Sequence, residues 1–495
     1  MTTCNATLTS NIRKMIKNNI KYFYCNKYAA FVIAVAIFLI LHKIHNVQYF
    51  PWDAKGYWAL SNPEIFFNYP KEIRGYFFPL LLLPAHSISN LSSEYQNYPY
   101  RLLSALVYSY TLTIVLPEFY VRVFGGNLTT SRRVVVSLLI AVLFPGLIIY
   151  PLSDLPAFLL LIGSISALLN AKTAMSFIAK SFFALIGGVL AAGAYNTRTI
   201  YLFPLLCIFC AVPFYFFLAQ SIKNRFLGVL AFATGLLLVS LPQSFINHST
   251  HETWSPAVIS QNTDKSLFAL QLMWGITIQR YETTIDPTSP SASRYFMDKA
   301  GEKIFISENL ENGKVTVANY ISLVARHPLD FLGIYGRHLV NGLDLRDGEV
   351  YVKNSNWVNN KIAALNFFVL ALGLLSALVR YGALKSKGQT SSVNVSMNRS
   401  TADITWPLFI FLLLLPIFAI IPGAIETRFF LPLHVLLYCT IAFNTSGREI
   451  TIYLKKHWIL VLVCSAFLCL IFFAVSTNTM SSMQPFINPP YRFGQ

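Results

Sequence analysis

The sequence predicts an all-α, polytopic membrane protein with about eleven transmembrane helices. Of its 495 residues, 55% are hydrophobic and only 12% are charged, whereas soluble domains carry roughly a quarter charged residues. Apolar segments long enough to cross the roughly 30 Å hydrocarbon layer as helices recur along the whole chain. The net charge of +17 comes from basic residues at the ends of these segments, so it indicates membrane topology and not nucleic-acid binding.

Twelve apolar segments are visible, and one of them is doubtful as a span. The segment 76–91 contains Pro79, Pro84 and His86 and has about 16 residues, fewer than the ~20 that a full span needs. Whether it is re-entrant, interfacial or spanning stays open. The twelve segments are 29–46, 76–91, 101–121, 134–150, 155–171, 181–197, 199–219, 226–246, 362–380, 405–422, 429–445 and 458–476.

The distribution of Lys and Arg favours eleven spans, because leaving out one span inverts the side assigned to every later loop. If 76–91 does not cross, every short loop on the side of the N-terminus is basic. We therefore expect a multi-pass protein of the bacterial inner membrane, with its N-terminus in the cytoplasm and its C-terminus outside. The basic residues on the cytoplasmic side are then Arg13, Lys14, Lys17, Lys21, Lys27, Arg122, Arg132, Arg133, Lys172, Lys180, Lys223, Arg225, Arg380, Lys385, Lys387, Arg399, Arg448, Lys455 and Lys456.

This topology divides the chain into two membrane modules and two large outer regions. Within the larger outer region we expect short amphipathic helices at Ala292 to Leu310 and at Thr316 to Asn341, the second broken at His327-Pro328. The divisions are a cytoplasmic segment 1–28, a transmembrane module 29–246 with a first outer loop 47–100, a periplasmic loop 247–361, a transmembrane module 362–476 and a periplasmic tail 477–495.

The first candidate for chemistry is Asp53, which lies just beyond the first span among Trp52, Tyr57 and Trp58. A carboxylate that is partly desolvated by aromatic neighbours has a raised pKa and is a better proton acceptor near neutral pH. The alternative is an aromatic belt at the membrane interface with one solvated acid.

The second candidate is Asp154, which is wedged between two spans with almost no connecting loop. A carboxylate so close to the bilayer is costly unless it faces a polar cavity. The alternative is a cap on the following span, with Pro156 in its first turn.

Three arginines at outer span ends, Arg74, Arg198 and Arg428, are candidates for binding a phosphate. A guanidinium group chelates phosphate oxygens bidentately and stays charged in a medium of low dielectric constant. The alternatives are snorkelling to lipid headgroups and, for Arg428, a local ion pair with Glu426.

No cofactor site is evident. The loop histidines His248, His251, His327 and His338 match no strong ligand spacing, so no motif supports a divalent metal. The absence of a Walker loop and of a Rossmann glycine pattern argues against a nucleotide-sugar as the direct donor.

Several short motifs occur in a consistent order and on one side of the membrane. They are Asp53 with Tyr57, Arg74-Gly75-Tyr76-Phe77-Phe78-Pro79, Arg101-Leu102-Leu103-Ser104-Ala105-Leu106, Asp154, Thr197-Arg198, His327-Pro328-Leu329-Asp330-Phe331, and Glu426-Thr427-Arg428-Phe429-Phe430-Leu431-Pro432. Together they resemble the GT-C superfamily of membrane glycosyltransferases, which includes protein O-mannosyltransferases, the aminoarabinose transferase of lipid A and bacterial polysaccharide-modifying enzymes.

The resemblance implies a GT-C-like fold and a glycosyltransferase that uses a polyprenyl-phosphate-linked sugar on the periplasmic face. Asp53 would act as general base, Arg198 with Arg74 or Arg428 would bind the donor phosphate, and Asp154 would orient the acceptor or the basic residues. Tyr57 and Glu426 would contact substrate, and the acceptor would be a glycan or a lipid-linked glycan such as a lipopolysaccharide O-antigen unit. Many members carry two adjacent acidic residues in the first loop, but in this sequence alanine follows the acid, as Asp53-Ala54. The missing second acid weakens the inference that this chain binds a divalent metal as those members do.

Two other functions stay open. An O-antigen polymerase or ligase would depend on arginines and a histidine in outer loops, and would not require Asp53 and Asp154. A transporter or flippase would place ionisable residues near the middle of spans and show internal symmetry.

Overall fold

The computed structural model describes residues 26–72, 74–91, 97–259, 267–285, 293–313, 316–346, 350–351, 360–390, 405–444 and 447–484. Among these residues, eight helices are long and apolar enough to cross a membrane. The predicted polytopic helical class is therefore confirmed, while the number of eleven spans stays a prediction. The expected cytoplasmic segment and most of the C-terminal tail lie outside the described residues.

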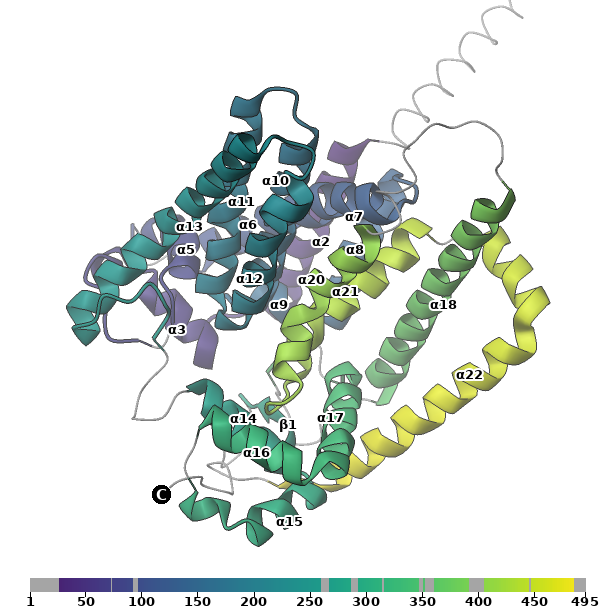
Figure 1. Cartoon of the computed structure of the whole chain (residues 1–495). Helices are drawn as coiled ribbons and strands as arrows, with labels where there is room; N and C mark the ends of the chain where they lie inside the picture. Colours follow the sequence, from purple (N-terminus) through teal and green to yellow (C-terminus); the bar gives the residue numbers. More distant parts are fainter. Residues whose placement is uncertain are drawn as a thin grey trace, which may run out of the picture.

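The N-terminal module contains most of the long helices (Figure 1). The segment 76–91 forms the 13-residue helix α5, about 20 Å long and so shorter than the hydrocarbon layer. The elements of this module are α2 (Lys27–His45), α3 (Trp52–Leu60), α4 (Pro63–Phe66), α5 (Phe77–Ser89), α6 (Tyr98–Tyr110), the π-helical turn η1 (Thr111–Val115), α7 (Leu116–Phe124), α8 (Thr130–Leu143), α9 (Gly146–Ile149), α10 (Asp154–Thr173), α11 (Phe177–Thr197), the 3-10 turn η2 (Thr199–Tyr201), α12 (Leu202–Ala211), the π-helical turn η3 (Val212–Phe216) and α13 (Ile222–His251).

The core of the module is built around α10, which is apolar on nearly all sides and largely buried. Helices α10, α11 and α13 pack side by side. The approach of α11 to α13 depends on two glycines: a Cβ at Gly188 would lie 2.1 Å from the carbonyl oxygen of Phe232, and one at Gly235 would lie 2.1 Å from that of Leu185. Small residues at such crossings allow helix backbones in a membrane to approach closely.

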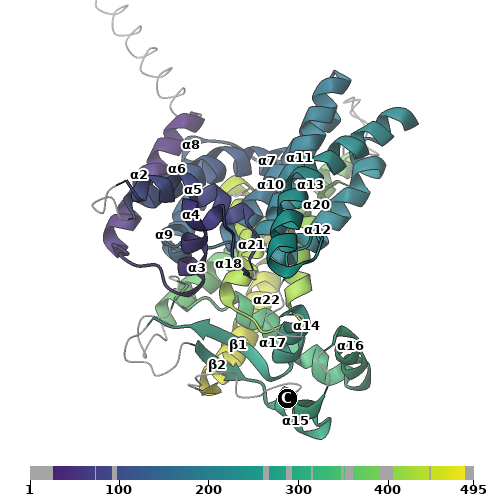
Figure 2. The same cartoon turned by 90° about the vertical axis from the view of Figure 1, so that its left-hand side faces the viewer.

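The segment 267–343 forms a small helical layer with a short antiparallel sheet, below the helices of the N-terminal module in Figures 1 and 2. The break at His327-Pro328 is present, because proline lacks an N–H and restricts the residue before it. The prediction of one helix from Ala292 to Leu310 is wrong at its start, where the chain forms a strand. The elements are α14 (Leu267–Thr277), β1 (Ile278–Thr283), β2 (Ser293–Met297), α15 (Lys299–Ser307), the 3-10 turn η4 (Leu310–Asn312), α16 (Val317–Arg326) and α17 (Pro328–Leu343).

The C-terminal module adds two long helices and two shorter ones. Helix α22 has a non-helical residue at His457 and pairs through β3 with β2 of the outer region. The elements are α18 (Asn360–Thr390), α20 (Thr405–Ile420), the 3-10 turn η5 (Thr427–Phe430), α21 (Leu431–Cys439), the π-helical turn η6 (Thr440–Asn444), α22 (Gly447–Ser481) and β3 (Met483–Gln484).

Candidate functional site

Asp53 lies in the first turn of α3, where it is held between two arginines. Its Oδ1 accepts a hydrogen bond from Arg74 at 2.7 Å, and its Oδ2 accepts one from Arg428 at 3.0 Å. The Asp53 side chain is still 44% exposed. The three residues are distant in the sequence and come together only because the first outer loop folds against the turn between α20 and α21. The predicted alternative of a solvated acid in an aromatic belt does not describe this geometry.

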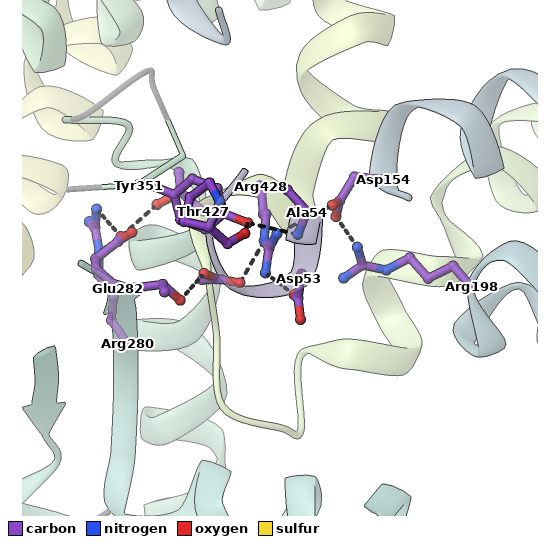
Figure 3. Close-up of polar contacts among 12 residues, drawn as sticks. Asp53, Ala54, Asp154, Arg198, Arg280, Glu282, Tyr351, Thr427 and Arg428 are labelled. Carbon is purple, nitrogen blue, oxygen red and sulfur yellow. Dashed lines mark hydrogen bonds and ion pairs between the residues drawn. The ribbon is translucent and has the colours of Figure 1, made fainter. Parts of the chain in front are cut away.

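Arg428 is the centre of the cluster (Figure 3). Besides Asp53, it contacts Glu426, with Nε 2.6 Å from Oε2, and Asp154, with Nη1 3.8 Å from Oδ2. Its side chain is only 8% exposed, so it needs these carboxylates as counter-charges. The local ion pair that we had considered for Glu426 and Arg428 is present, and it is part of a larger network.

Asp154 begins α10 and pairs with Arg198 at the C-terminal end of α11. The Asp154 side chain is 4% exposed, and its Oδ2 has no hydrogen-bond partner among the described residues. Its Oδ1 accepts from Arg198 and not from a backbone N–H of its own first turn, so the alternative of a helix cap is not supported. The Arg198 guanidinium also lies 4.5 Å from the centre of the Phe429 ring, which favours a fixed orientation.

A cavity of about 260 Å³ opens beside this network, and both charged and apolar side chains line it. Its charged lining residues are Asp53, Arg74, Arg198 and Arg428, and Tyr57 also lines it, with its ring 5.2 Å from the Arg74 guanidinium carbon. Its apolar lining residues include Ile200, Leu267, Phe268, Leu272, Ala419, Ile420 and Phe429. The cavity therefore suits a ligand that combines an anionic group with a hydrocarbon portion.

The pKa of Asp53 is lowered, and our expectation of a raised value is wrong. Burial acts to raise the pKa, but the nearby Arg428 and Arg74 lower it by more. The carboxylate is therefore ionised and able to accept a proton, but the two arginines make it a weak base while they remain bound to it.

Glu426 lies behind the cavity and not among the residues that line it. It is buried, and burial raises its pKa to about 7. Its Oε1 accepts from the Thr283 hydroxyl at 3.2 Å, while its Oε2 faces Arg428. This placement favours a role in positioning Arg428 over the direct substrate contact that we had expected.

A second layer of charges, which the sequence analysis missed, supports the first. Glu282 of β1 accepts from the Thr427 hydroxyl at 3.1 Å and pairs with Arg280 at 2.6 Å. Tyr281, between them, lines the cavity. The sequence Ile-Gln-Arg-Tyr-Glu-Thr of Ile278–Thr283 has no period-two alternation of polar and apolar residues, so no local pattern signalled this strand.

The loop histidines His248, His327 and His338 each contact a different partner. His327 pairs with Glu308 at 2.7 Å, His248 stacks on Trp254, and the Nδ1 of His338 donates to the carbonyl oxygen of Ile421. In the part of the chain that the structure describes, no group of three or more His, Cys, Asp or Glu side chains could hold a metal ion.

Comparison of the chain with protein-family models, with curated proteins and with solved structures found no match. The functional interpretation therefore depends on the geometry of the cavity and on its residues.

Proposed function

We propose that the protein is a glycosyltransferase that moves a sugar from a polyprenyl-phosphate donor to an acceptor glycan or lipid-linked glycan, on the periplasmic face of the bacterial inner membrane. The observation that carries the proposal is the position of the Asp53 carboxylate, held between Arg74 and Arg428 at a cavity that Arg198 also lines. A GT-C-like enzyme of this kind needs a base and a phosphate site close together.

The lining of the cavity supports a lipid-phosphate donor. Arg74, Arg198 and Arg428 line one cavity, and guanidinium groups bind phosphate oxygens in pairs. Apolar side chains of α14 and α20, including Leu272 and Ile420, line the same cavity. A prenyl chain would pack against these side chains.

In the proposed reaction, a hydroxyl of the acceptor attacks the anomeric carbon of the sugar. A new carbon–oxygen bond forms as the bond from the anomeric carbon to the phosphate oxygen breaks, and its electron pair leaves with the lipid phosphate. Asp53 takes the hydroxyl proton. The arginines stabilise the charge that grows on the phosphate.

The lowered pKa of Asp53 gives this mechanism a built-in order. A donor phosphate would compete with Asp53 for Arg74 and Arg428, both of which contact the carboxylate. Removing two positive neighbours raises a carboxyl pKa. Binding of the donor would therefore make Asp53 a stronger base when the sugar is in place.

The experiment is transfer of radiolabelled sugar by the purified full chain. We expect transfer from a synthetic polyprenyl-phosphate sugar and none from the corresponding nucleotide-sugar. Arg198→Lys keeps the charge but loses the bidentate fork, so it should raise the donor concentration needed for half-maximal rate. Lys71→Gln removes an outer cation that does not line the cavity and is the matched control. Transfer from the nucleotide-sugar alone would overturn the proposal.

A further inference from the structure

A second, larger cavity of about 1000 Å³ lies on the outside of the N-terminal module, between α2, α5 and α6. Figures 1 and 2 show these three helices next to one another. The cavity is lined by Leu39, His42, Lys43, Asn46, Pro84, Ala85, Ile88, Tyr98, Pro99, Arg101, Leu102, Leu103 and Leu106. Most of its surface is therefore apolar.

Its polar residues gather at one end. Lys43 and Asn46 belong to the C-terminal end of α2, and Arg101 belongs to the first turns of α6. This end leads directly into the loop that carries Asp53, so it lies at the same side of the membrane as the candidate active site. The lining contains two cations and no Asp or Glu.

The two cations are available to a ligand. Lys43 is exposed, and its ammonium group forms no hydrogen bond or ion pair with any residue that the structure describes. The Nη2 of Arg101 donates to Asn46 Oδ1 at 3.2 Å and to the carbonyl oxygen of Val47 at 2.8 Å, and the guanidinium carbon lies 5.0 Å from the centre of the Tyr98 ring. Its Nη1 remains free to donate to an anion at the edge of the groove.

The groove is separate from the candidate active site. The two cavities share no lining residue. Between them lie α3 and α5, joined by an edge-on contact of Tyr57 with Phe78 at 5.0 Å and a stack of Trp58 on His86 at 4.3 Å. A molecule in the groove would therefore not be in contact with Asp53.

We propose that this groove is a binding site for an anionic phospholipid of the leaflet that contains the Asp53 cavity. The headgroup phosphate contacts Lys43 and Arg101, and an acyl chain lies along the exposed side chains of Leu39, Leu102 and Leu106. The cations lie at one end of the groove and apolar side chains line the rest, which matches the anionic headgroup and the acyl chains of such a lipid. The site does not depend on the proposed transferase activity.

The test is native mass spectrometry of the purified full chain with phosphatidylglycerol or phosphatidylcholine. We expect phosphatidylglycerol to be retained preferentially, and Lys43→Gln to lower its retention about fivefold, the effect of one cation close to an anionic headgroup. Lys71→Gln should have no such effect. Leu102→Trp fills the groove and should lower retention of both lipids, whereas Leu138→Trp, at an exposed position of α8, should not.

Three results would overturn the proposal. The first is equal retention of the two phospholipids by the unaltered chain, and the second is unchanged retention of phosphatidylglycerol in Lys43→Gln. The third is displacement of phosphatidylglycerol by an equimolar amount of polyprenyl phosphate in the unaltered chain but not in Lys43→Gln. That third result would assign the groove to polyprenyl phosphate in place of the phospholipid.

Discussion

Arg428 joins the three carboxylates Asp53, Asp154 and Glu426. A guanidinium in this position determines the charge state of its neighbours, since it lowers the pKa of Asp53 even though burial acts in the opposite direction. The sequence indicated Asp154 because a carboxylate near the bilayer is costly, Asp53 because aromatic residues flank it, and Arg74, Arg198 and Arg428 because guanidinium groups chelate phosphate. The sequence could not show that the arginines hold Asp53, since that depends on contacts between distant segments.

Glu426→Gln should change how stability depends on pH. Burial raises the pKa of Glu426 from 4.5 to about 7, so between these values the folded state holds a proton that the unfolded state has released. The contribution of Glu426 to stability therefore falls as pH rises from about 4.5 to about 7 and is level above that range. We expect the melting temperature of the unaltered chain in detergent, relative to that of Glu426→Gln at the same pH, to fall over this range. A difference between the two chains that does not change with pH would contradict the buried position, and Glu64→Gln is the exposed control.

Asp154→Ala should impair sugar transfer more than it impairs membrane insertion. It removes the counter-charge of Arg198, and removal of one partner of a buried ion pair costs about 3–5 kcal/mol. The measurement compares product formed with the amount of protein in the membrane fraction, and Asp154→Asn controls for side-chain shape. Unchanged product per membrane-inserted protein would leave Asp154 with no role at the site.

At the scale of elements, hydropathy located the long helices well but did not determine the outer region. Eight of the expected spans coincide with long apolar helices. The segments 134–150, 405–422 and 429–445 instead form shorter or interrupted helices. The strand Ser293–Met297 was mistaken for helix, because its pairing with β1 and β3 is a contact between distant segments that no local pattern records.

The α11–α13 crossing gives an element-scale test. Gly188→Ala should destabilise the protein by about 1–3 kcal/mol, because the added Cβ meets a backbone carbonyl oxygen and the helices must move apart. The control is Gly336→Ala, where a Cβ meets nothing within 4 Å, and where alanine should stabilise the helix slightly. Thermal unfolding in detergent measures both, and equal melting temperatures for the two variants would show that the helices are not in such close contact.

At the scale of the whole molecule, the fold brings the end of α11, the start of α3 and the turn before α21 to one cavity. The order of the motifs predicted that they would share one side of the membrane, because each follows an outward crossing in the eleven-span topology. It did not predict the sheet that closes the cavity through Tyr281, or the separate groove between α2, α5 and α6.

The eleven-span topology is directly testable. Reporter fusions at residues 126, 222, 390 and 450 should give cytoplasmic signals, and fusions at 70, 300 and 485 should give outside signals, because basic residues fill the short loops near the first set. A cytoplasmic signal at residue 300 would place the cavity on the wrong side for a donor presented at the periplasmic face.

The most direct measurement is transfer of radiolabelled sugar by Asp53→Asn with the concentration of the polyprenyl-phosphate donor varied. The variant keeps the side-chain shape but cannot accept the proton, so turnover at saturating donor should fall by roughly 10²–10⁴-fold. Because Arg74 and Arg428 are then released from the carboxylate that they contact, the donor concentration needed for half-maximal rate should not rise. Near-normal turnover by Asp53→Asn would contradict the assignment of Asp53 as the base, and with it the account of the cavity as the site of transfer.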